Sequence, residues 1–203
     1  MTSRKYVTLN QGLRPFLDMK KFRISRDSQA LYITAVAKDR LPVFHTDAIK
    51  KVTCDALNEA RNSGRFLILA YVIMPDHLHL ITDAPDSSAE VLRYVKGITA
   101  RRVIDYLKDG NFESSLAKLR HQDWKRKHSY SLWQKEKNVF SIFSEAMLMQ
   151  KVNYIHLNPV RAGLVERAID YRWSSARIWQ RCPAEDEPLM VDIDRIVWRC
   201  GGA

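Results

Sequence analysis

The chain has 203 residues, of which 46% are hydrophobic and 28% are charged, a balance typical of a folded globular protein and not of a disordered one. Its 33 Lys and Arg residues outnumber 23 Asp and Glu residues, so the formal net charge is +10. An excess of positive charge of this size favours a polyanionic partner, most often nucleic acid. The alternative is a generally basic protein without such a partner.

The cysteines and the longest apolar run limit the protein class further. Cys54, Cys182 and Cys200 are widely spaced and form no CxxC pair, which argues against a disulfide framework or a zinc knuckle. The longest apolar run, at 66–74, is far shorter than the roughly 20 residues of a membrane span. The N-terminus lacks the apolar segment of a signal peptide. We therefore expect a soluble protein of the cytoplasm with no membrane partner.

The first third of the chain predicts an extension, a strand and a helix. Residues 1–29 interleave basic and aromatic side chains with little periodicity, and we expect them to lie over the core or on a ligand. Residues 30–37 are rich in apolar and β-branched side chains and predict the first strand. The apolar spacing of residues 46–63 predicts a helix, and Gly64 stands where a C-terminal cap belongs.

Two further strands and a second helix follow. Residues 66–73 form a continuous apolar run, which is typical of a strand buried on both faces. After a short break, residues 77–82 continue as the third strand. In the next segment, at 86–107, the apolar spacing again predicts a helix. Ser87 and Glu90 have the spacing of a capping box at its start.

The remaining elements complete an α+β fold. Residues 131–137 predict a fourth strand, and residues 144–156 predict a helix after it. The order β-α-β-β-α-β, then a helix, indicates a ferredoxin-like or split βαβ antiparallel sheet with the third strand in a central position. We divide the chain into an extension at 1–29, a core domain at 30–165 and a tail at 166–203 that packs on the core or contacts nucleic acid.

Two histidines at the start of the third strand are candidate metal ligands. His77 and His79 stand at i and i+2 in a strand, so both imidazoles project from one face while Leu78 points to the other. Two imidazoles fixed on a rigid element make half of a divalent-metal site. The alternative is a solvated or hydrogen-bonded pair. Asp76 could orient the His77 ring as a hydrogen-bond acceptor or serve only in the turn.

A tyrosine and an asparagine on the last predicted helix could complete such a site. Tyr154 and Asn158 are i and i+4 neighbours, roughly 6 Å apart, beside the apolar stripe of the helix. A helix docked on the histidine-bearing face could present a phenol and an amide oxygen to one metal ion. The alternative is that Tyr154 packs half-buried and that Asn158 ends the helix before Pro159.

Basic residues with interleaved aromatic side chains gather in the segment 118–130. Lys and Arg neutralise phosphates, and aromatic rings stack on unpaired bases. Basic residues on the helix at 86–107 are further candidates, and an ordinary solvated surface is the alternative for both groups. The candidate nucleic-acid contacts are Lys96, Arg101, Arg102, Arg120, Trp124, Lys125, Arg126 and Lys127.

Several segments resemble the signatures of one family in their order and spacing. They include YVIMPDHLHLI (71–81), NYIHLNPVRAGLV (153–165) and YRWSSARIW (171–179). Together they resemble the REP-associated tyrosine transposases, which are members of the single-tyrosine HUH transposase superfamily, where HUH means His-hydrophobe-His. The resemblance covers residues 31–179, and the stretch 138–149 departs from the family pattern.

The resemblance implies a DNA-cleaving enzyme with its catalytic domain at 30–165. It makes His77 and His79 the ligands of Mg²⁺ or Mn²⁺ and Tyr154 the nucleophile that forms a 5′-phosphotyrosine intermediate. It also makes Asn158 the third ligand or a polar group that faces the metal. Related insertion-sequence transposases have glutamine there, and the shorter asparagine leaves this third ligand in question.

The implied function is a metal-dependent single-strand DNA endonuclease and strand transferase that acts on REP-like hairpin DNA. Two alternatives stay open: a mobile insertion-sequence transposase with the same chemistry, and a hairpin-binding module without catalysis. The implied partners are single-stranded and hairpin DNA. The protein would act on the nucleoid, as a monomer or as a homodimer.

Overall fold

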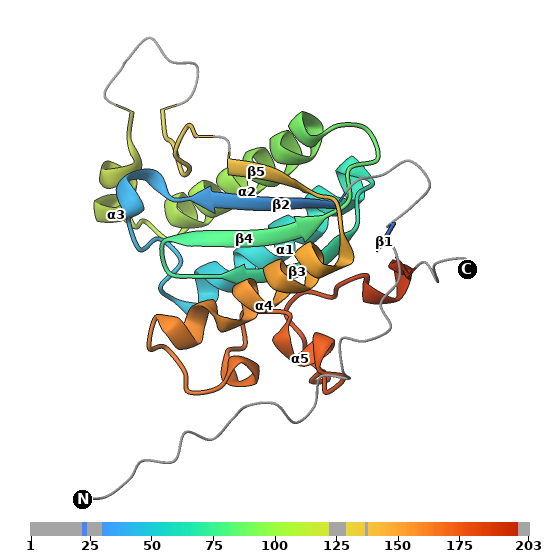
Figure 1. Ribbon diagram of the computed structural model, residues 1–203. Coiled ribbons are helices and arrows are strands. Elements are labelled where there is room, and N and C mark those ends of the chain that lie inside the picture. The colour runs from blue at the N-terminus through green and yellow to red at the C-terminus, as the bar shows by residue number, and fades with distance from the viewer. Residues whose placement is uncertain (1–21, 24–29, 122–128, 137, 199–203) are drawn as a thin grey trace, which may run out of the picture.

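The computed structural model describes residues 22–23, 30–121, 129–136 and 138–198. Its centre is an antiparallel sheet with the strand order β3-β4-β2-β5 (Figure 1). The strands of this sheet are β2 (Ala30–Val36), β3 (Ile68–Ile73), β4 (His77–Thr82) and β5 (Asn138–Ile142). The helices are α1 (Asp47–Gly64), α2 (Ser88–Asp109), α3 (Glu113–Leu119), α4 (Glu145–Arg161) and α5 (Ala176–Trp179).

Short elements surround this core. A second, two-stranded sheet pairs β1 (Phe22–Arg23) with β6 (Val197–Trp198), so that the two ends of the described chain meet. Single turns of 3₁₀ helix are η2 (Lys38–Arg40), η3 (Ala168–Asp170) and η4 (Ile193–Arg195). None of the helices in the described ranges is long and apolar enough to cross a membrane.

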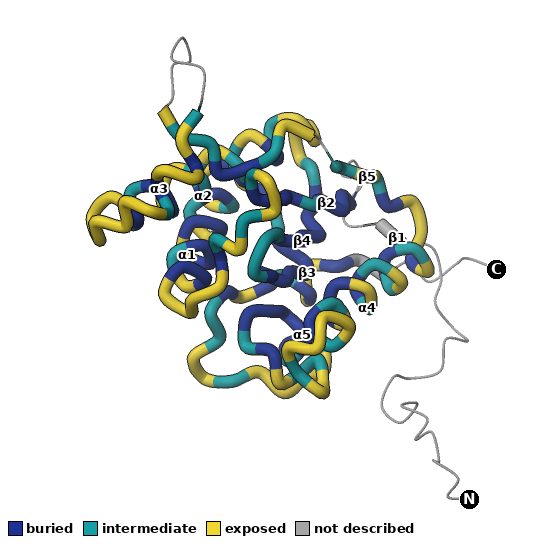
Figure 2. Tube along the Cα trace, turned by 90° about the vertical axis from the view of Figure 1, so that its left-hand side faces the viewer, coloured by how far each residue is buried: buried dark blue, intermediate teal, exposed yellow. Residues whose placement is uncertain are grey.

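Helices cover the two faces of the central sheet in different ways. α1 and α2 pack against each other on one face, which we call the back face, while α4 lies across the other, the front face (Figures 1 and 2). Alternate residues of β4 divide between these faces. His77 and His79 belong to the front face, and the fully buried Leu78 and Leu80 belong to the back face.

The predicted α+β fold is confirmed, but its fourth strand was placed too early. The expected strand at 131–137 is wrong, because β5 follows that segment and Trp133 forms only an isolated bridge with Ala37. The Trp133 indole Nε1 donates to the carbonyl of Lys96 at 3.1 Å, and its ring stacks on Phe44 with centroids 5.3 Å apart. The large side chain therefore anchors this segment to α2 instead of extending the sheet.

Helix α4 is longer than the sequence predicts. It starts after Ser144, whose hydroxyl accepts a hydrogen bond from the backbone at the first turn. The alternative in which the helix stops before Pro159 is wrong, because this proline lies in the last turn, where its missing N–H removes only one helical bond. The chain leaves the helix at Gly163, whose φ of 68° is left-handed. Asn158 consequently lies inside the helix.

Gly64 is required for packing and not for capping. It is the last residue of α1, and the left-handed cap expected there is formed by Arg65, with φ 50°. A Cβ added to Gly64 would lie 2.7 Å from the Tyr94 ring and 2.9 Å from the Phe66 ring. Only glycine therefore allows α1 to approach α2 this closely.

The C-terminal segment protects the free edge of β3. Backbone bonds join Ile73 N to Trp173 O at 2.9 Å and Ser175 N to Tyr71 O at 3.0 Å. The Trp179 indole donates to a β3 carbonyl at 2.8 Å. Because an exposed strand edge invites unwanted pairing, this cover stabilises the sheet as a closed unit. The domain boundaries at residues 30 and 166 stay predictions.

Candidate functional site

The front face brings together the two histidines and the tyrosine that the sequence singles out. The His77 and His79 rings meet edge to face with centroids 4.8 Å apart. The Tyr154 ring, presented by α4, stands edge-on to His79 at 5.5 Å. Tyr154 is 42% exposed, so its phenol is open to a ligand. A segment distant in sequence thus places a phenol beside the histidine pair.

His79 is held by two hydroxyl groups of β2. Its Nδ1 lies 2.8 Å from the Tyr32 hydroxyl and 2.9 Å from the Thr34 hydroxyl. Burial lowers the pKa of His79 to about 3, and charge interactions with the His77 ring and Lys151 act in the same direction. The ring is therefore neutral near pH 7. When Nδ1 carries the proton and donates it to a hydroxyl, Nε2 has a free electron pair.

His77 is oriented by the residue before it. Its Nδ1 lies 2.6 Å from a carboxylate oxygen of Asp76, and the other oxygen accepts a bond from Arg40 at 3.0 Å. Partial burial opposes the charge of Asp76, but the bonds from His77 and Arg40 hold its pKa below the usual value. A carboxylate that accepts the Nδ1 proton leaves Nε2 of His77 free, as at His79.

The donor atoms in this region fit a divalent cation. Asn158 lies one helical turn beyond Tyr154, and its Nδ2 is buried without a hydrogen-bond partner. Amide oxygen and nitrogen are hard to distinguish, and the reversed amide would put Oδ1 in that unsatisfied position. Two neutral imidazoles and an amide oxygen are ligands that divalent metals accept. Over the described ranges, no three His, Cys, Asp or Glu side chains gather into a metal cluster.

The structure adds four residues that the sequence did not single out for the site. Tyr32 stacks on His79 with centroids 5.4 Å apart and meets the Tyr154 ring edge-on at 6.4 Å. Lys151 Nζ lies 4.8 Å from the centre of the Tyr32 ring, and the Arg161 guanidinium lies 5.3 Å from that of Tyr154. Thr34 is the fourth. The helix spacing of the two cations relative to Tyr154 was readable in the sequence, but the pairing of β2 with β4 was not.

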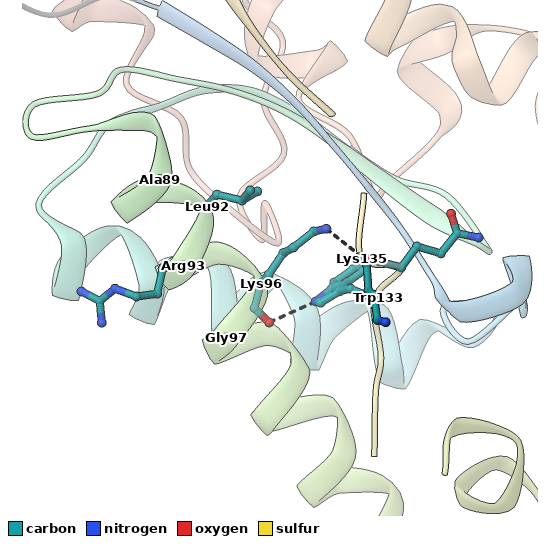
Figure 3. A pocket seen from close by; sticks show the side chains of 8 residues that line it. Ala89, Leu92, Arg93, Lys96, Gly97, Trp133 and Lys135 are labelled. Atoms are coloured by element: carbon teal, nitrogen blue, oxygen red, sulfur yellow. Dashed lines mark hydrogen bonds between the residues drawn. The ribbon is translucent and has the colours of Figure 1, made fainter. Parts of the chain in front are cut away.

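Lys96 lies away from this cluster. It belongs to α2, on the back face, and its ammonium donates to the carbonyls of Gln134 and Glu136 at 3.0 and 2.9 Å. Burial lowers its pKa. Lys96 and Trp133 line a pocket of about 480 Å³ between α2 and the segment before β5 (Figure 3). Two of the three donors of the Lys96 ammonium therefore bind the backbone of its own chain, and the role of Lys96 as a nucleic-acid contact stays a prediction.

Three more candidate nucleic-acid contacts lie in the described ranges, and they too are separate from the histidine pair. Arg101 and Arg102 of α2 both bind the carboxylate of Glu59 on α1, at 2.8 and 2.6 Å. Arg120 follows α3 and lies 5.9 Å from the centre of the Tyr130 ring. The remaining candidates lie outside the described residues; they are Trp124, Lys125, Arg126 and Lys127. The structure brings none of the described candidates to the front-face cluster.

Comparison with known proteins settles the family. Residues 26–158 match the model of the IS200-like transposases. The chain belongs to this family. The match covers β2 to most of α4 and so includes both histidines and the tyrosine. The resemblance read from the sequence is confirmed.

Two relatives extend this result. A Haemophilus influenzae protein that carries the provisional name REP-associated tyrosine transposase is 29% identical over 77% of this chain and 85% of its own length. A solved structure of a REP-associated tyrosine transposase bound to a REP hairpin is 17% identical. The structural alignment covers 95% of this chain and 93% of the solved transposase chain, with a TM-score of 0.55. At this identity the second comparison shows a shared fold.

Proposed function

We propose that this IS200-like transposase is a metal-dependent single-strand DNA endonuclease and strand transferase with Tyr154 as its nucleophile. The observation that carries the proposal is the Tyr154 ring standing 5.5 Å from His79, on a helix that is separate from the histidine strand. DNA binding alone needs no exposed phenol beside a pair of oriented imidazoles. A tyrosine held at a metal-competent histidine pair is suited to covalent catalysis.

The family implies a divalent metal, Mg²⁺ or Mn²⁺, and His77 and His79 would hold it through Nε2, with Asn158 as the third ligand. Such an ion polarises a phosphate and offsets the charge that develops on it. The chain itself orients both imidazoles through Nδ1. Asp76 contacts Nδ1 of His77, and the Tyr32 and Thr34 hydroxyls contact Nδ1 of His79. Each ring is therefore fixed before any ligand arrives.

The proposed reaction is an exchange of one phosphate ester for another. The Tyr154 oxygen attacks a DNA phosphorus and loses its proton, while the bond from phosphorus to the 3′ oxygen breaks. The 5′ phosphate stays on the tyrosine, and the 3′ oxygen leaves as a hydroxyl after taking up a proton. The reverse attack by a 3′ hydroxyl rejoins strands, so one site serves cleavage and transfer.

We propose REP-like hairpin DNA with an unpaired flank as the substrate. Two facts support this choice: the net charge of +10, and the fold shared with a transposase whose solved structure holds a REP hairpin. Trp124 and the basic residues around it lie beyond the described ranges and remain candidate contacts. Arg101 and Arg102 remain candidates for the duplex, because they are exposed on the far side of the sheet.

Adduct formation tests the proposed chemistry. The protein is incubated with Mn²⁺ and a hairpin oligonucleotide carrying a single-stranded flank, and the products are separated by denaturing electrophoresis. We expect a protein–DNA adduct with the wild type and none with Tyr154→Phe. Tyr106→Phe, on α2, is the matched control and should form the adduct normally.

Two outcomes would contradict the proposal. An adduct with Tyr154→Phe would mean that another residue is the nucleophile. Hairpin binding by the wild type without cleavage, across a panel of hairpins and with both metals, would favour the binding module. Removal of metal with a chelator should abolish the adduct, and an undiminished adduct would contradict metal dependence.

A further inference from the structure

The front face of the sheet is only partly covered by helix. α4 packs against β3 and β4 and reaches β2 through Lys151 and Tyr154, which both contact the Tyr32 ring, whereas Phe140 of the edge strand β5 stays 55% exposed (Figures 1 and 2). We call the half of the face formed by β2 and β5 the open half, because its outer strand is left exposed. The back face has no such gap, because α1 and α2 cover it together. The open half adjoins the candidate site directly, since β2 is the neighbour of β4.

Phe140 projects from the open half. In the antiparallel register it stands directly opposite Tyr32, so both side chains point to the front face. Phe140 is nevertheless 55% exposed, whereas Tyr32 is 5% exposed. A large aromatic ring on a sheet face, left in solvent beside a buried one, is available for a flat ligand.

The ring is continuous with the candidate site. Tyr32 links Phe140 to the site, because its hydroxyl contacts His79 and its ring contacts Tyr154. Neighbouring strands lie about 4.8 Å apart, so β5 is roughly 10 Å from the histidine strand. A strand of DNA with its phosphate at Tyr154 would therefore reach Phe140 within a few nucleotides.

Two cations of α4 lie against the aromatic rings of the site. Lys151 Nζ stands 4.8 Å from the centre of the Tyr32 ring, and the Arg161 guanidinium lies 5.3 Å from that of Tyr154. Neither is joined to a carboxylate in the described part of the structure. Exposed aromatic rings interleaved with free cations are how proteins bind single-stranded nucleic acid without reading its sequence. An apolar protein partner would not need these charges.

We infer that Phe140 is the stacking platform for an unpaired base next to the cleaved phosphate, with Lys151 as the cation for the adjoining backbone. The inference rests on the proposed function, because it takes Tyr154 as the point of attack. It names a subsite for single-stranded DNA on the β2–β5 half of the front face. The hairpin stem would contact other parts of the protein.

Binding measurements in the Tyr154→Phe background test the subsite without cleavage. Fluorescence anisotropy compares a hairpin that carries an unpaired flank with the same hairpin lacking it, at constant salt. We expect Phe140→Ala to weaken binding of the flanked hairpin about 5- to 150-fold, the range for losing one stacked base. Binding of the bare stem should not change. Phe112→Ala, which removes a phenylalanine that is 43% exposed at the start of α3, is the matched control.

Abasic nucleotides locate the stacked base. Each flank position is replaced in turn by an abasic sugar, which keeps the phosphate and removes the base. At one position the abasic change should weaken wild-type binding as much as Phe140→Ala does, and the two changes together should add nothing further. Phe140→Trp should retain affinity, and its indole fluorescence should be quenched by the flanked hairpin.

The outcomes separate the inference from the proposed function. Unchanged affinity of Phe140→Ala for the flanked hairpin, or an equal loss for the bare stem, overturns the subsite, while an adduct with the wild type upholds the chemistry. Loss of flank affinity in a protein that never forms an adduct upholds the binding platform and overturns the endonuclease. A change in self-association alone would make the face a protein interface and overturn the subsite.

Discussion

The two faces of the central sheet differ in what they contain: the back face is packed with apolar side chains, and the front face carries the polar candidate site. On the back face, β4 contributes Leu78 and Leu80, both fully buried under α1 and α2. On the front face, the same strand contributes His77, which contacts Asp76, and His79, which contacts hydroxyl groups of β2 and the Tyr154 ring of α4. Since consecutive residues of a strand point to opposite faces, a single hexapeptide carries both the packing and the chemistry.

The difference shows how a polar cluster can be held rigidly inside a small protein. Leu78 lies between the two histidines and is locked in the apolar core, so neither imidazole can move far along the strand. The front face then needs only a few directed hydrogen bonds to set the ring orientations. Stability should therefore depend on the back face, and ligand binding on the front face.

Leu80→Ala is the strongest way to break the back face. It removes a fully buried side chain that stands opposite Ile33 and Tyr71 in the sheet. We expect a loss of about 2–5 kcal/mol in the free energy of unfolding, from lost burial and the cavity that remains. Urea denaturation followed by circular dichroism measures it.

Tyr154→Phe is the front-face control for that experiment. Its phenol is exposed, so the free energy of unfolding should change by less than about 0.5 kcal/mol. The folded fraction of Leu80→Ala should still form the DNA adduct. A large destabilisation by Tyr154→Phe, or a native-like stability of Leu80→Ala, would contradict the division of labour between the faces.

Tyr32→Phe tests the front face at its most buried polar contact. The substitution keeps the ring against His79 and Tyr154 and removes only the hydroxyl that contacts His79 Nδ1. Loss of such a supporting contact typically weakens metal binding about 10- to 100-fold. Electron paramagnetic resonance of free Mn²⁺ during a titration measures the affinity directly, without DNA or turnover.

Thr34→Val sharpens the same experiment. The second hydroxyl lies 2.9 Å from the same nitrogen, so the double variant should lose more affinity than either single variant. Tyr106→Phe, which removes a hydroxyl from α2, should bind Mn²⁺ like the wild type. Unaltered affinity in Tyr32→Phe and in the double variant would show that Nδ1 needs neither hydroxyl.

The sequence predicts the parts of the site that depend on local spacing. His77 and His79 follow from an i, i+2 pair in a strand, and Tyr154 and Asn158 from an i, i+4 pair in a helix. Hydrophobic periodicity likewise predicts every strand of the sheet except the fourth. Their assignment as ligands and nucleophile stays a prediction, because their chemistry is not visible in the fold.

The remaining parts depend on which strands pair and in what register. Tyr32 belongs to the site because it lies on the same face as His79 in the neighbouring strand, two residues from the Thr34 that pairs with His79, and Phe140 joins this face through the pairing of β2 with β5. Neither relation is encoded by local spacing. Trp133 misled the strand assignment because a β-favouring side chain can equally fill a gap between a helix and a loop.

Glu145→Gln should have the smallest effect of these substitutions. It tests the cost of a carboxylate that is buried on α4, the helix of the front face. Glu145 begins the buried stripe of α4, and neither of its carboxylate oxygens has a hydrogen-bond partner. Burial raises its pKa. Burying a charge costs more than burying a neutral amide, while the helix N-terminus returns about 0.3–1 kcal/mol to a negative charge. The amide is polar as well, so Glu145→Gln removes only the cost of burying the charge, and we expect a modest gain in the free energy of unfolding at pH 7.

The pH dependence identifies the cause of that gain. Because the folded-state pKa of Glu145 is raised, the native protein retains this proton to a higher pH than the unfolded chain does, and wild-type stability falls as the carboxyl ionises. The advantage of Gln should vanish below about pH 4, where the carboxyl is protonated in both states, and grow as the pH rises through the folded pKa.

Urea midpoints between pH 4 and 8 measure this pH dependence, with Glu113→Gln at the exposed start of α3 as the control. If Gln stabilised the protein equally at every pH, the gain would come from packing and not from removal of the charge. If Gln lowered the free energy of unfolding at pH 7, the attraction between the carboxylate and the helix N-terminus would exceed the cost of burying the charge.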